Sequence, residues 1–73
     1  MIKYTFELIE TTIPLFIEKD HVIPATSLAH AIEKFARKHE LEEPAYWDEP
    51  MVDQTIDLIF RNKLGIIVYR VTW

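Results

Sequence analysis

The sequence has 73 residues, 49% of them hydrophobic, with a formal net charge of −4 and no cysteine. This length fits one domain, residues 1–73, near the lower limit for a self-sufficient core. Disulfides are excluded, three histidines without a thiol argue against structural zinc, and the negative charge argues against direct nucleic-acid binding, which needs clustered Lys and Arg. We therefore expect neither metal nor cofactor.

Residues 2 to 10 alternate apolar and polar side chains, which predicts a strand. Ile2, Tyr4, Phe6 and Leu8 fall on one face, and Ile9 falls on the other. This start lacks the uninterrupted apolar core of a signal peptide, and no run of the sequence approaches transmembrane length. We expect a cytoplasmic protein with no membrane attachment.

A second extended segment is expected after Thr12, with Ile13, Leu15, Ile17 and Ile23 in one register. Pro14 places it at a sheet edge or makes it a strand start, because proline donates no ladder hydrogen bond. Residues 19–20 fit either a turn or a bulge.

A helix is expected directly after Ser27, which is a suitable N-cap. Its apolar residues recur at helical spacing: Leu28, Ala31, Ile32, Phe35 and Ala36. Glu33 and Arg37 are spaced for an ion pair on the opposite face. Pro44 prevents the helix from continuing far into the next segment.

That next segment, residues 40–53, carries six carboxylates, an aromatic pair and no Lys or Arg. We call it the acidic connection. Nothing in the sequence determines how far apart its carboxylates lie, so it predicts no acid–base catalytic pair. Packing of Trp47 on the core is slightly favoured over exposure, whereas Glu42, Glu43, Asp48 and Glu49 are expected to be exposed.

Residues 54–73 allow two interpretations. A hairpin with a loop at residues 62–65 places Leu58 opposite Tyr69 and Asp57 opposite Arg70, and it makes one face wholly apolar. Alternatively, residues 49–63 form a second helix, with Gly65 after its end. The hairpin is preferred because Leu58 would leave the buried stripe of that helix.

The elements assemble into an α+β domain with the order β-β-α-β-β, in which one amphipathic helix packs on an antiparallel-rich sheet. Four apolar residues are expected on the outer face of this sheet: Ile9, Ile59, Ile66 and Val68. Such a patch suits pairing of two copies or binding of a partner, unless an edge strand or loop covers it.

The sequence has no catalytic signature. His30 and His39 are nine residues apart and face opposite sides of a helix, so they cannot share an ion. The single glycine excludes a glycine-rich phosphate loop, and Ser27 is better explained as a cap than as a nucleophile. We expect no enzyme activity.

Residues 22–36, Val-Ile-Pro-Ala-Thr-Ser-Leu-Ala-His-Ala-Ile-Glu-Lys-Phe-Ala, resemble the strand and capped helix of tiny β-β-α-β proteins. These include phage-encoded inhibitors of bacterial machinery, such as small anti-CRISPR proteins and a phage inhibitor of RNA polymerase. The resemblance implies a stoichiometric binder of a host protein, with an acidic surface over a nucleic-acid-binding site. It carries over no functional residue.

The resulting functional hypothesis is a non-enzymatic protein–protein interaction module of the acidic, stoichiometric inhibitor type, which occludes a basic surface of a host protein. The residues expected to contact the partner are Glu42, Glu43, Tyr46, Trp47, Asp48 and Glu49. Two alternatives remain: a structural or regulatory homodimer that pairs through the outer sheet face, and, less favoured, a small-ligand binder or enzyme.

Overall fold

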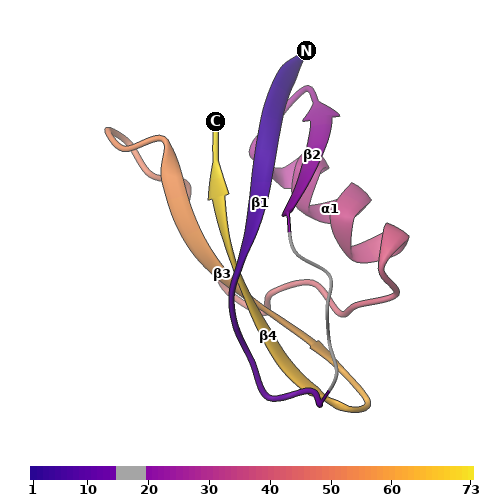
Figure 1. Ribbon diagram of the computed structural model, residues 1–73. Helices are drawn as coiled ribbons and strands as arrows, with labels where there is room; N and C mark the ends of the chain where they lie inside the picture. Colours follow the sequence, from indigo (N-terminus) through magenta and orange to yellow (C-terminus); the bar gives the residue numbers. More distant parts are fainter. Residues whose placement is uncertain (15–19) are drawn as a thin grey trace.

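The computed structural model describes residues 1–14 and 20–73 and has the expected α+β architecture. In chain order, the elements are β1 (Ile2–Thr11), β2 (Asp20–Ala25), α1 (Leu28–Lys38), β3 (Thr55–Asn62) and β4 (Gly65–Thr72). The strands form one antiparallel sheet in the order β2-β1-β4-β3, and α1 packs against one face of it (Figure 1). Within the described residues, no helix is long and apolar enough to cross a membrane.

Strand β1 follows the predicted alternation. Tyr4 and Phe6 of β1 point into the core, and the pairing with β4 shifts by one residue between Leu8 and Glu10. Ile13 is also buried, but Pro14 follows β1 in a turn and is not part of a strand. Leu15, Ile17 and Lys19 lie outside the described residues, and β2 begins at Asp20.

The C-terminal hairpin has the predicted register, so the alternative helix over residues 49–63 is wrong. Leu58 pairs with Tyr69, and Asp57 pairs with Arg70, whose Nε donates to the Asp57 Oδ1 at 2.9 Å. Asn62 itself pairs with Gly65, which leaves a turn of only residues 63–64 between the strands. Burial of alternate residues, including Leu58, stabilises the strand over the helix.

Helix α1 begins and ends as local chemistry predicts. The Ser27 Oγ accepts a hydrogen bond from the His30 amide at 3.1 Å, which satisfies one free donor of the first turn. Arg37 lies in the last turn, where the helix dipole favours a cation, and its Nη2 is 3.2 Å from the Glu33 Oε1.

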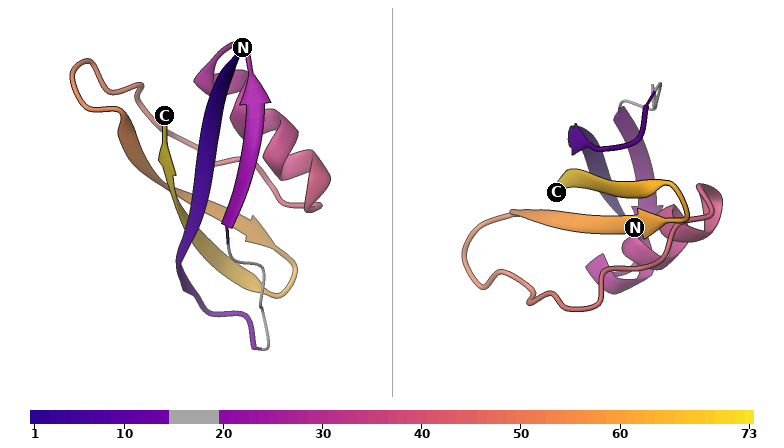
Figure 2. Two further views of the ribbon diagram at one scale, coloured as in Figure 1. Left: turned by 45° about the horizontal axis from the view of Figure 1, so that its top comes forward. Right: turned by 90° about the horizontal axis from the view of Figure 1, so that it is seen from below.

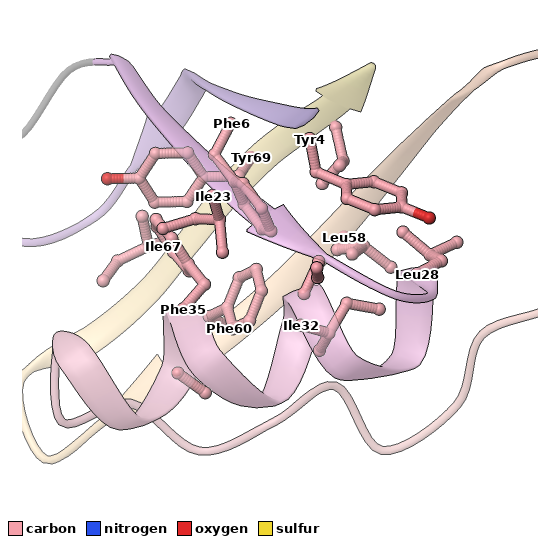
Figure 3. Close-up of a cluster of buried hydrophobic side chains, with 14 of the residues drawn as sticks. Tyr4, Phe6, Ile23, Leu28, Ile32, Phe35, Leu58, Phe60, Ile67 and Tyr69 are labelled. Carbon is pink, nitrogen blue, oxygen red and sulfur yellow. The ribbon is translucent and has the colours of Figure 1, made fainter. Parts of the chain in front are cut away.

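Phe35 of α1 lies at the centre of the core, where Phe6, Phe60 and Tyr69 of three strands surround it (Figure 3). It stacks on Phe6 with ring centroids 4.1 Å apart and an angle of 6° between the rings. Tyr69 and Phe60 meet it at tilted or edge angles, at 4.7 and 5.2 Å. These contacts fix α1 on one face of the sheet and leave the opposite, outer face uncovered by the helix.

Candidate protein-binding surface

The acidic connection leaves α1 through a tight left-handed turn. Glu40 has a φ of 54°, and its amide donates to the Arg37 carbonyl at 3.3 Å. The Leu41 amide donates to the Ala36 carbonyl at 2.8 Å, and the Leu41 side chain packs against the core. This pair of hydrogen bonds is the Schellman motif, which caps the helix and turns the chain sharply. It directs the connection towards the free edge of β3.

One backbone bridge joins the connection to β3. The Glu42 amide donates to the Arg61 carbonyl at 2.7 Å, and the Arg61 amide reaches the Glu42 carbonyl at 3.5 Å. A hollow lies on each side of this bridge. The larger, about 620 Å³, is lined by residues 40–42 and 62–64, and the smaller, about 230 Å³, by residues 44–46, 57–59 and 61. Among the described residues, this bridge is the one place where backbone hydrogen bonds join the connection to β3.

The aromatic pair of the connection is divided between core and solvent. Trp47 is half-buried and packs against the core, as slightly favoured above, whereas Tyr46 is 81% exposed. The Tyr46 hydroxyl donates to the Asp48 Oδ2 at 2.7 Å, and this hydrogen bond raises the pKa of Tyr46. Trp47 thus anchors the connection, and Tyr46 presents its ring beside the smaller hollow.

The four carboxylates expected at the surface are all exposed: Glu42, Glu43, Asp48 and Glu49. None forms an ion pair with another part of the described chain. Burial raises the pKa of the Tyr4 phenol, and the charge of Glu49 raises it further. These carboxylates therefore give the connection an uncompensated negative charge.

The connection swings out from the sheet before it enters β3 (Figures 1 and 2). In this part of it, Met51 is 99% exposed and Val52 is 90% exposed. Met51 therefore does not pack on the core. An apolar tip thus follows the acidic stretch.

The outer face of the sheet carries the expected apolar residues. Ile9, Ile59 and Ile66 are exposed, and Val68, which pairs with Ile59, is half-buried. No described segment covers them as a layer. Beside this patch, Arg70 lies between Glu7 of β1 and Asp57 of β3.

Among the described residues, no group of three or more potential ligands is positioned to hold a metal ion. The fold does bring His21 and His39 together, with ring centroids 4.4 Å apart, and both lie against Phe35. Sequence spacing did not reveal this pair because it depends on how α1 packs against β2.

Comparison of the chain with protein-family models, curated proteins and solved structures finds no significant match. The candidate surface therefore rests on the chain's own geometry: an anchored loop with exposed carboxylates, an exposed tyrosine and a hollow beside β3. The sequence did not reveal the Glu42–Arg61 bridge, since nothing in the alternation of β3 marks which of its edges is free.

Proposed function

We propose that this chain is a non-enzymatic protein-binding module whose acidic connection covers a basic surface of a partner protein. The observation that carries the proposal is the set of exposed carboxylates around Tyr46, which form no ion pair within the described part of the chain, on a loop anchored by Trp47. Acidic groups of this kind attract a Lys/Arg-rich surface and speed association, while an aromatic side chain supplies contact area. Because Trp47 packs on the core, Tyr46 is the aromatic contact and Trp47 is its support.

The partner, in this proposal, is a cytoplasmic host protein, and binding is stoichiometric. The resemblance of residues 22–36 to phage-encoded inhibitors supports a target whose basic surface normally binds nucleic acid. An acidic loop would then compete with the phosphate backbone for the same cations. Affinity for such a partner falls as salt concentration rises, since exposed charges are screened.

The test compares two variants that each lose four negative charges and reach a formal net charge of zero. One neutralises the connection (E42Q/E43Q/D48N/E49Q), and the matched control neutralises other surfaces (E7Q/E10Q/D20N/E33Q). Each is immobilised, proteins retained from native-host extract are identified by mass spectrometry, and binding of the purified candidate is titrated at several salt concentrations.

The expected partner binds the wild type and the control, binds more weakly as salt rises, and is lost on the connection variant. Equal affinity for the wild type and the connection variant would contradict the proposal. An equal loss on both variants would show that net charge matters and the connection does not. Circular dichroism checks that both variants retain the fold.

A second candidate function is a homodimer that pairs through the outer sheet face. The exposure of Ile59 (50%) and Ile9 (42%) beside Val68 favours it, since apolar patches of this kind often mark interfaces. Sedimentation equilibrium tests it directly. A mass that doubles with concentration and returns to the monomer value in Ile59→Lys supports this function, whereas a monomer throughout excludes it.

A further inference from the structure

The outward edge of β3 has backbone groups that no described strand pairs. In an antiparallel ladder, the backbone groups of successive residues point alternately to the two sides. Arg61 uses its N–H and C=O on the side away from β4, where they meet Glu42. The backbone N–H and C=O groups of every second residue therefore also point away from β4, namely those of Ile59, Asp57 and Thr55. Beyond the Arg61 bridge, no strand of the described chain lies along this edge.

A hydrogen bond at the other end of the hairpin supports this assignment of which β3 residues point away from β4. The Trp73 amide donates to the carbonyl of Gln54 at 3.0 Å, so Gln54 points its carbonyl towards the β4 side. Gln54 and Arg61 are an odd number of residues apart, and they use opposite sides as alternation requires.

The other edge of the sheet, β2, is protected. Pro24 has no N–H to offer, and the Lys34 Nζ donates to its carbonyl at 2.7 Å. Proline and lysine are the residues with which natural sheets block edge pairing. β3 has neither residue, so the β2 edge is protected against an added strand in this way and the β3 edge is not.

The smaller hollow described above lies along this open stretch of β3. Residues 44–46 of the connection form one side of it, and residues 57–59 and 61 form the other. An added strand lies about 4.8 Å from its neighbour. Tyr46, held by Asp48, would flank such a strand on the side of the acidic connection.

We propose that the open edge of β3 takes an extended segment of a partner protein as an added strand, with basic side chains on every second residue. Residues opposite Ile59 and Asp57 would face the outer side of the sheet and be apolar or β-branched. The alternate residues would face the acidic connection and carry Lys or Arg. This inference rests on the proposed function and specifies how the partner binds, with main-chain hydrogen bonds supplying affinity and alternate side chains supplying specificity.

A second copy of this chain is a poorer occupant of the edge. The open groups of β3 belong to Thr55, Asp57 and Ile59, so an antiparallel pair of two β3 strands that uses all of them is centred on Asp57. This pairing would place two carboxylates directly opposite each other, which is destabilising. A partner segment with basic residues has no such conflict.

The probe is an acetylated and amidated peptide, Thr-Lys-Val-Lys-Val-Lys-Thr, added to the ¹⁵N-labelled full chain. Two methylated forms of it each carry three N-methyl groups, on peptide positions 2, 4 and 6 in one form and on positions 3, 5 and 7 in the other. These two peptides match in composition and charge, but only one of them loses the donors that would face β3. A peptide with Glu in place of Lys is the charge control.

We expect saturable shifts and slower amide exchange at Thr55, Asp57 and Ile59. One methylation phase should weaken binding at least about tenfold relative to the other, consistent with the loss of backbone hydrogen bonds and close approach. The variant Ile59→Pro should weaken binding similarly, while Ile59→Thr, which keeps the N–H, should not. The methylated peptides keep the test valid should Ile59→Pro fail to fold.

Equal affinity of the two methylated peptides would overturn strand addition, as would shifts confined to other surfaces or no saturation at millimolar peptide. If binding is insensitive to methylation phase but is lost on E42Q/E43Q/D48N/E49Q, the acidic connection remains the binding surface and only the edge inference fails. If that variant binds as well as the wild type while methylation phase matters, the proposed function fails instead. Slower exchange at β3 without peptide that increases with protein concentration would identify a second copy as the occupant.

Discussion

Replacement of Glu40 by glycine should stabilise the domain, although it removes a charged surface residue. Glu40 is the one non-glycine residue in the described chain with a positive φ, and it occupies the position of the Schellman motif where glycine is usual. The left-handed conformation costs an L-residue roughly 1–2 kcal/mol because its Cβ approaches the following carbonyl oxygen. Glycine avoids this cost, but it makes the unfolded chain more flexible, which lowers the free energy of unfolding by about 0.4–1 kcal/mol.

The net gain in the free energy of unfolding from the backbone is about 0.5–1 kcal/mol. The variant Glu40→Ala separates this gain from the effect of removing the charge. Both substitutions remove a carboxylate next to the negative end of the helix dipole, and this removal raises the free energy of unfolding by about 0.3–1 kcal/mol in each variant. The difference between the glycine and alanine variants therefore reports the backbone alone. For a domain of this size, it corresponds to a rise in Tm of about 2–8 °C.

Thermal unfolding followed by circular dichroism, with urea titrations at 25 °C, measures this difference. The glycine variant should unfold at the higher temperature and at the higher urea concentration, with an unchanged dependence of the unfolding free energy on urea. An alanine variant as stable as the glycine variant would refute a left-handed Glu40, and with it the turn that directs the acidic connection.

Three further substitutions test local geometry. Ser27→Ala should lower the unfolding free energy by about 1 kcal/mol in urea titration, because it removes the helix cap, and Ser27→Asp should restore most of the loss. Gly65→Ala should cost about 1–3 kcal/mol, since the added Cβ would overlap the Thr12 hydroxyl, and a loss of the same size in a Thr12→Ala background would argue against that contact. Asp48→Asn should lower the pKa of Tyr46 towards its ordinary value, because it removes the carboxylate that accepts the hydrogen bond of the phenol. An NMR titration of the Tyr46 ring that gives the same pKa in the variant would contradict this hydrogen bond.

The fold was predictable where the pattern of apolar residues is local. Alternation placed Tyr4 and Phe6 in the core, helical spacing placed Phe35 there, and the preference for one apolar face selected the register that pairs Leu58 with Tyr69. A shift of one residue in that register would turn every apolar side chain of β3 to the other face, so the choice was strongly determined.

The candidate site was predictable only in part. Exposure of Glu42, Glu43, Asp48 and Glu49 follows from the cost of burying unpaired charge, and the structure agrees. The sequence did not determine that Tyr46 is exposed while Trp47 packs on the core, because both are large amphipathic rings in a segment without regular structure. Their placement depends on which core surface lies beneath the connection.

The sequence by itself indicated the order of the elements, favoured the hairpin register over a second helix and located an acidic segment between helix and hairpin, because these depend on the spacing of neighbouring residues. The tertiary structure decided that β3 and β2 are the edges, that Lys34 and Pro24 close one of them, and that Glu42 bridges Arg61 at a single point on the other. These features depend on which distant segments lie side by side. They make the acidic segment the flank of an open strand edge, which its composition does not reveal.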